Sequence, residues 1–303
     1  MPVNATNGVD DSEEFDDCGY AQTHFQINLK DVEVEILGKD DIQLQPKSHN
    51  NIVAHSNLRK SRSVVEREIS ALDSIFEDFP DVKKEVISEI QKSDSNLCAM
   101  SFTEVPLVLK DGHYERIASS SNSASSSEVG NGKFLMYTFV CGGNSYNSGK
   151  ASYTASTNGR WSKNSVAGGS DYPASGEDFV LQMTPSAFSR SSDTFSAQYD
   201  NSPIVGVSGS DFYRCDGGTN YVQYSVLDDP LGYRQNKNFT LTSYSTAWPS
   251  SNSRMIQSYY VHTWSQMTIS VSVSFGSDGP GLTITPGIES KQWQVYDYVT
   301  FNF

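Results

Sequence analysis

The feature that most constrains this chain is a two-residue alternation of apolar and hydroxyl side chains. It is clearest in "MTISVSVSFGSDGPGLTITPG", where the residues between the apolar positions of the first half are all Thr or Ser. Those apolar positions are Met267, Ile269, Val271, Val273 and Phe275. Because successive side chains of a β-strand point to opposite faces, the pattern predicts a strand with one apolar face and one hydroxyl face.

The same alternation runs through residues 133–303 in short segments such as "DFVLQM", "NFTLTSYS" and "QWQVYDYVTFNF". Clusters of Gly, Asn, Asp and Ser, for example "CGGNSYNSG", separate these segments and indicate turns. Many short alternating strands joined by turns predict an all-β antiparallel sandwich. In the last segment Asp297 interrupts the apolar face, which indicates either a bulge or a buried carboxylate with satisfied hydrogen bonds.

Residues 18–117 predict a small α+β unit that precedes the sandwich. "HFQINLKDVEVEILG" predicts two short strands, or one strand with a bulge, because its apolar register flips at Lys30-Asp31. The following period is helical and predicts a pair of helices at about 63–92, with Ser63 and Glu66 in capping-box spacing and Pro80 opening the second helix. The acidic residues 1–17 are expected to be disordered.

A serine-rich segment, "ASSSNSASSSEVGNG", covers residues 118–132 and separates these two regions. It predicts a flexible linker, and the alternative is a long loop inside one domain. The charge distribution favours the linker: residues 1–118 carry 12 Lys and Arg against 23 Asp and Glu, whereas the remainder carries 10 against 13.

Composition limits the compartment and the partners. The formal net charge of -14 argues against nucleic-acid binding, which requires a basic surface. Abundant Ser, Thr, Asn and Tyr in short strands favour an extracellular or cell-surface protein, in a style resembling that of exported bacterial proteins. The first residues do not form a signal peptide, so this interpretation supposes a removed leader; the alternative is a cytoplasmic protein.

The chain has four cysteines, which allow three complete pairings. If the protein is exported, the simplest arrangement has one disulfide in each region, Cys18–Cys98 and Cys141–Cys215. The alternative is four free buried thiols in a reducing compartment. The spacing lacks a C-x-x-C pair, and neither a metal site nor a cofactor is expected.

Aromatic residues supply the candidate binding site. Within "QSYYVHTWSQM", the alternation that places Tyr259 and Val261 inward leaves three rings outward, those of Tyr260, His262 and Trp264. Rings in a row on a sheet suit contact with sugars, because they combine apolar surface with polar tips. Further candidates are Tyr296 and Tyr298 on the last segment, and Trp161 and Trp248 beside polar loops. The alternative is that this stripe packs under a second layer.

The sequence therefore favours a non-enzymatic exported or cell-surface β protein that binds a glycan or another extracellular surface. Familiar catalytic motifs such as G-x-S-x-G, the P-loop and H-E-x-x-H are not found. A hydrolase with an unrecognised site is the first alternative, since paired acids such as Glu177-Asp178 could serve glycoside chemistry.

A second alternative comes from Met267–Gly287. A Ser/Thr-alternating hairpin around Gly-Pro-Gly resembles the inserting hairpins of aerolysin-type pore-forming toxins. The terminal alternation of Val299, Phe301 and Phe303 is similar to the closing strand of outer-membrane barrels. Most of the other candidate strands are shorter than the roughly 9–11 residues of a membrane-spanning strand, so membrane insertion is not the favoured interpretation.

Overall fold

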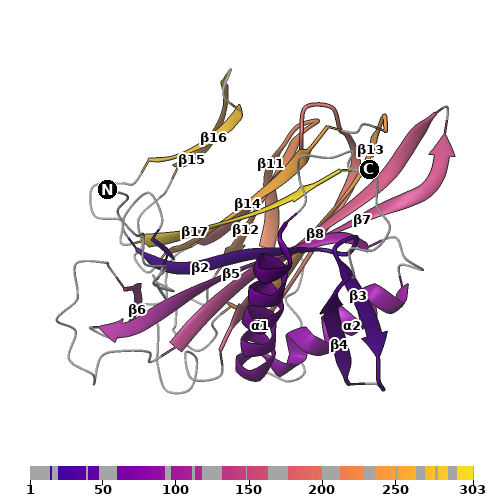
Figure 1. The fold of residues 1–303 in the computed structure, drawn as a ribbon. Helices are drawn as coiled ribbons and strands as arrows, with labels where there is room; N and C mark the ends of the chain where they lie inside the picture. The colour runs from indigo at the N-terminus through magenta and orange to yellow at the C-terminus, as the bar shows by residue number, and fades with distance from the viewer. Residues whose placement is uncertain are drawn as a thin grey trace, which may run out of the picture.

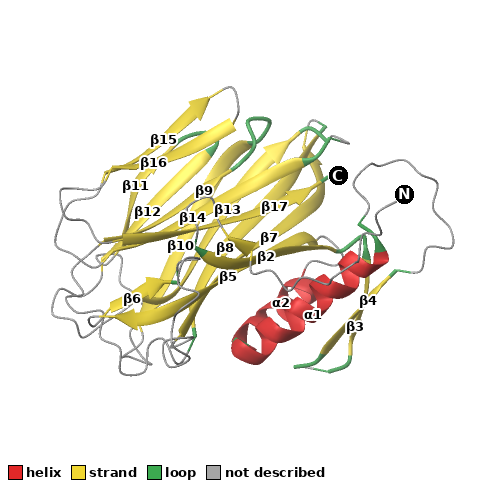
Figure 2. Ribbon diagram, turned by 60° about the vertical axis from the view of Figure 1, so that its left-hand side comes forward, coloured by secondary structure: helices red, strands yellow, loops and turns green. Residues whose placement is uncertain are grey.

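The computed structural model describes residues 14–15, 20–38, 40–47, 60–92, 97–110, 113–117, 132–147, 149–162, 177–199, 212–227, 236–249, 252–263, 270–276, 279–285 and 292–302. They build two antiparallel sheets packed face to face, with two helices on the outer side of the larger sheet (Figure 1, Figure 2). The predicted antiparallel β architecture is confirmed.

The larger sheet has eight strands. In spatial order they are β1 (Glu14–Phe15), β2 (Ala21–Asn28), β5 (Leu97–Lys110), β7 (Gly132–Asn147), β8 (Lys150–Trp161), β13 (Asn236–Ala247) and β10 (Ser189–Tyr199), with β6 (His113–Arg116) paired to the end of β5. Strand β1 lies within the first 17 residues, so the disorder expected there does not hold at Glu14 and Phe15.

The smaller sheet has five strands. Their order is β11 (Phe212–Gly217), β12 (Tyr221–Leu227), β9 (Glu177–Met183), β14 (Arg254–Thr263) and β17 (Gln292–Phe301). Two hairpins lie outside both sheets, one of β3 (Val32–Ile36) and β4 (Ile42–Pro46), the other of β15 (Ser270–Gly276) and β16 (Gly279–Thr285). Among the described strands, β15 and β16 pair only with each other.

The helices are α1 (Arg62–Asp78) and α2 (Pro80–Lys92), close to the pair predicted at about 63–92. The cap differs from the prediction: Ser61 accepts a hydrogen bond from the backbone N–H of Val64, and Ser63 lies inside the helix. Pro80 opens α2 as expected. Neither of these helices, nor any other in the described part of the chain, is long and apolar enough to cross a membrane.

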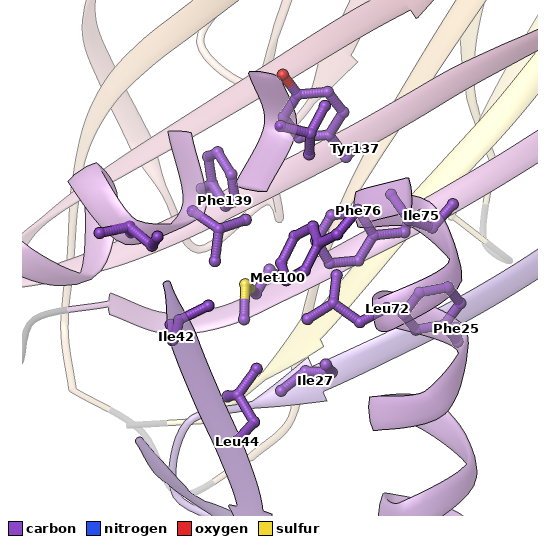
Figure 3. Packing of buried hydrophobic residues seen from close by; sticks show 14 of the residues in the cluster. Phe25, Ile27, Ile42, Leu44, Leu72, Ile75, Phe76, Met100, Tyr137 and Phe139 are labelled. Atoms are coloured by element: carbon purple, nitrogen blue, oxygen red, sulfur yellow. The ribbon is translucent and has the colours of Figure 1, made fainter. Parts of the chain in front are cut away.

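The helices and the β3–β4 hairpin bury one face of the larger sheet (Figure 3). Helix α1 contributes Leu72, Ile75 and Phe76, and β4 contributes Ile42 and Leu44. Opposite them lie residues of the sheet: Phe25, Ile27, Met100, Tyr137 and Phe139. Strands β5 and β7 are therefore covered on both faces, which explains the nearly continuous apolar run "KFLMYTFV" in β7.

The separate α+β unit predicted for residues 18–117 does not form. Strand β2 pairs with β5, and β5 pairs with β7 from Leu97 to Leu107, so strands from both predicted regions belong to one sheet. The two strands predicted from "HFQINLKDVEVEILG" are confirmed as β2 and β3. Of the predicted linker, residues 118–131 lie outside the described residues, and Gly132 begins β7.

The free edge of β17 is closed by side chains of the larger sheet. The Gln26 amide donates to the carbonyl of Thr300 at 2.7 Å and accepts from its N–H at 2.6 Å. Arg116 donates to the carbonyl of Gln294 at 2.7 Å. These side chains occupy backbone groups that would otherwise be open to pairing with another chain.

The predicted disulfides are wrong. Neither Cys98 nor Cys141 forms a disulfide bond, which excludes both Cys18–Cys98 and Cys141–Cys215. Instead the two thiols lie on neighbouring strands, with Cys98 in the bulge between Leu97, which pairs with Cys141, and Ala99. Burial raises the pKa of Cys98 to about 11 and that of Cys141 to about 12, so both stay protonated at neutral pH. Cys18 and the Cys215 side chain lie outside the described residues.

A substitution in α1 tests the packing of the helices on the sheet. Leu72 is fully buried, so Leu72→Ala is expected to lower the free energy of unfolding by about 2–5 kcal/mol in urea denaturation. Leu37→Ala is the matched control, because Leu37 is 55% exposed and loses little buried contact. Equal effects of the two substitutions would contradict helix packing against the larger sheet.

Candidate functional site

Strand β14 is inverted relative to the prediction. Tyr260 is 0% and His262 3% exposed, whereas Tyr259 lies on the opposite, outer face and is only partly buried. The alternation was ambiguous because Tyr259 and Tyr260 are adjacent in β14 and point to opposite faces of the strand. Tyr260 and His262 of the predicted binding stripe are therefore buried between the two sheets. This agrees with the alternative prediction, that the stripe packs under a second layer. Trp264 lies outside the described residues.

Tyr260 and His262 hold a buried acid in place between the sheets. Asp178 accepts hydrogen bonds from the Tyr260 hydroxyl at 2.6 Å and the Thr263 backbone N–H at 3.1 Å, and it contacts His262 Nδ1 at 3.0 Å. Aromatic rings enclose the imidazole, with Trp161 at 5.1 Å and Trp293 at 5.0 Å between centroids. The predicted Glu177-Asp178 acid pair therefore supplies a structural carboxylate at Asp178, which is 1% exposed.

The two tryptophan candidates lie apart from each other. Trp161 packs edge-on against Phe134 at 5.3 Å and lines a cavity of about 560 Å³ beside the junction of α1 and α2. Trp248 is 58% exposed and contacts the turn that joins β7 and β8, where Lys150 Nζ lies 5.9 Å from its ring centroid. Trp161 belongs to a cluster of rings between the sheets, with Tyr114, Phe134, His262 and Trp293, and Trp248 lies outside that cluster.

A row of partly exposed rings does occur on the outer face, along β14 and β17. Tyr259 lies 4.8 Å from Tyr296, Tyr296 lies 5.5 Å from Tyr298, and Tyr298 stacks on His24 of β2 at 4.1 Å between centroids. We call Tyr259, Tyr296 and Tyr298 the tyrosine strip. Tyr296 and Tyr298 were predicted from the alternation of the last segment. Tyr259 and His24 were not, because their positions depend on strand pairing and on the approach of β2.

The rings of the tyrosine strip lie against one another at 26–35° between planes, so they offer edges and hydroxyls rather than a flat stacking face. The outer side chains of β14 and β17 in the described residues carry no charge: Met255, Gln257, Tyr259, Val261, Thr263, Gln292, Gln294, Tyr296, Tyr298 and Thr300. Gln257 donates to the hydroxyl of Tyr296 at 2.8 Å.

Burial keeps two phenols of the strip, those of Tyr259 and Tyr296, neutral. Burial raises the pKa of Tyr296 to about 12 and also raises the pKa of Tyr259. Each therefore keeps a hydroxyl proton under all physiological conditions. On the adjacent strand β9 the outer side chains Phe179, Leu181 and Met183 are buried, so the exposed part of this face is confined to β14 and β17.

Beneath the strip, Asp297 fixes β17 to the larger sheet. Its carboxylate is 0% exposed and accepts hydrogen bonds from Ser101 at 2.7 Å, Thr103 at 2.9 Å and Thr138 at 2.7 Å. His24 Nδ1 lies 3.6 Å from the same carboxylate and 2.8 Å from the Thr103 hydroxyl. Of the two predictions for Asp297, the buried and satisfied carboxylate is confirmed, and the β14–β17 ladder has no bulge there.

The described residues contain no group of three or more side chains suited to hold a metal ion.

Comparisons with known proteins assign no family. No family model matches the sequence, and no curated protein matches it. A variant of the major pilin subunit of Bacillus cereus has a TM-score of 0.27 and 14% identity; the match covers 45% of this chain and 32% of the pilin. Clostridium perfringens delta-toxin has a TM-score of 0.29 and 9% identity, over 65% of this chain and 93% of the toxin. A collagen-binding domain from a Staphylococcus aureus adhesin has a TM-score of 0.23 and 9% identity, over 40% and 81%. At such scores these similarities assign neither fold family nor function.

Replacing the buried carboxylate tests its role in holding the sheets together. Asp297→Asn keeps the size but turns an amide donor toward three hydroxyl donors, so it is expected to lower the free energy of unfolding by at least the roughly 1.5–3 kcal/mol of one charge-assisted hydrogen bond. Urea denaturation at pH 7 measures this. Asp41→Asn, at an exposed ion pair with Lys83, is the control and should change stability little. A similar loss in both variants would show that Asp297 has no special role.

The raised pKa of Tyr296 predicts an alkaline limit to stability. The pKa of folded Tyr296, about 12, exceeds the ordinary tyrosine pKa of about 10, so the folded state holds this proton more tightly. Its stabilising contribution is complete below pH 10 and is lost as the pH rises through 12. Tyr296→Phe should remove one late step from the phenolate absorbance titration, whereas Tyr244→Phe, at an exposed tyrosine, should leave that step in place. Loss of an early step in Tyr296→Phe would refute the assignment.

Proposed function

We propose that this chain is a non-enzymatic, extracellular binding protein that contacts glycans through the tyrosine strip. The observation that carries the proposal is the partly exposed outer face of β14 and β17, whose described side chains include no charged group, on a protein of net charge -14. The extracellular location rests on the Ser-, Thr- and Asn-rich composition, because neither Cys98 nor Cys141 forms a disulfide bond that would argue for it.

The chemistry of the strip suits sugars. Phenol and carboxamide groups donate and accept hydrogen bonds in one plane, as sugar hydroxyls require, and ring edges offer apolar surface to sugar C–H groups. Neutral groups are also cheaper to desolvate than ions when a neutral ligand covers them.

The support of the strip is rigid. Asp297 lies between Tyr296 and Tyr298 in β17 and is fixed by three hydroxyl donors from the larger sheet. Gln257 orients the Tyr296 hydroxyl, and His24 lies against the Tyr298 ring. Little side-chain freedom remains to be lost on binding, and such preorganisation favours affinity.

Calorimetric titration of the whole chain with cellohexaose, xylohexaose, chitohexaose and hexagalacturonic acid tests the proposal. At least one of these is expected to bind, and the double variant Tyr296→Ala, Tyr298→Ala is expected to weaken that binding roughly 5- to 150-fold. That range follows from about 0.5–1.5 kcal/mol for each aromatic contact.

Tyr244→Ala, at an exposed tyrosine on β13, is the matched control and should retain binding. Binding that survives loss of the strip, or is lost equally in the control, would contradict this site. Absence of binding to every probe would overturn the proposed function.

A further inference from the structure

A cavity of about 360 Å³ opens at the His24 end of the tyrosine strip. Tyr298 and His24, stacked at 4.1 Å, line it, so the strip and the cavity share a wall. Its lining also includes Lys60 and Glu68, from the start of α1, and Gln26, which closes the edge of β17. A ligand lying along the strip would place its end in this cavity.

The cavity carries a positive charge that the strip lacks. Lys30 and Lys60 line it, with Glu68 as the carboxylate among its lining residues. Glu68 is committed to Lys60, whose ammonium also donates to the carbonyl of Gln26 at 2.6 Å. Lys30 donates to the neutral amide of Asn302 at 2.7 Å, and this contact does not offset its charge.

We propose that the cavity selects an acidic saccharide, one whose carboxylate binds beside Lys30 while its neutral hydroxyls contact the tyrosine strip. The inference rests on the proposed function and adds the charge of the ligand to it. A chain of net charge -14 repels anions at long range, so a cationic cavity at the end of an uncharged strip is a local exception. The Lys30 ammonium, whose partner Asn302 is neutral, would form a stronger hydrogen bond with a carboxylate than with a sugar hydroxyl, because charge-assisted hydrogen bonds are stronger than neutral ones.

Hexagalacturonic acid and its fully methyl-esterified form are the matched probes, because they differ in charge and keep the same sugar backbone. The acid is expected to bind the intact protein about tenfold more tightly than the ester by calorimetry in low salt. Added salt should remove most of that difference, since it screens the partly exposed Lys30.

Substitutions at Lys30 test whether this side chain causes the preference for the acid. Lys30→Gln should bring the affinity for the acid close to that for the ester, and Lys30→Arg should retain the preference. Lys92→Gln, at an exposed lysine near the end of α2, is the control for net charge and should leave the preference unchanged.

The outcomes separate the two proposals. Equal binding of acid and ester, with both lost in the Tyr296→Ala, Tyr298→Ala variant, would overturn the acidic selectivity and leave the glycan-binding strip standing. A preference for the acid that persists in Lys30→Gln would overturn the assignment to this cavity. Failure of both uronic probes and of the neutral oligosaccharides would overturn the glycan function itself, and the selectivity with it.

Discussion

The buried carboxylate of Asp297 is the interaction on which the sandwich depends. A charge without solvent is tolerated only where hydrogen bonds replace its hydration, and here the donors are hydroxyls of two strands of the opposite sheet. The polar contacts continue as Thr138 approaches Thr157, and Thr157 bonds to Ser258 and Gln182 of the smaller sheet. Apolar packing alone would allow one sheet to slide on the other. These buried hydrogen bonds are all formed at only one alignment of the two sheets.

That alignment positions the tyrosine strip. Because side chains alternate along β17, seating Asp297 inward forces Tyr296 and Tyr298 outward. The same seating brings β17 against β2, where Gln26 and His24 meet Thr300 and Tyr298. The candidate site is therefore a consequence of the interior: a shift of one residue in β17 would bury the tyrosines and expose the carboxylate.

The sequence was informative wherever one face of an element is apolar and the other polar. It predicted the helical pair, the parity of β17 and the satisfied carboxylate of Asp297. It failed on β14, because Tyr259 and Tyr260 are both large and the wrong one was placed inward. It also failed to join β2 and β5 to the sandwich, since pairing between distant strands leaves no local pattern. Cys98 and Cys141 were assigned to different disulfides by proximity in sequence, although they lie on neighbouring strands.

The closure of β17 has a consequence for how the chain reaches its native state. This strand is synthesised after the other described strands, yet its partners include Gln26 and Arg116, made much earlier. Until it arrives, Ser101, Thr103 and Thr138 face an interior without their common acceptor. Contacts over such long sequence separations slow folding, because loop closure must precede them. During translation every strand of the larger sheet is made before β17, so the sandwich would stay incomplete, with the inner face of that sheet and one side of β14 open until β17 arrives. Exposed surface of this kind is what chaperones shield.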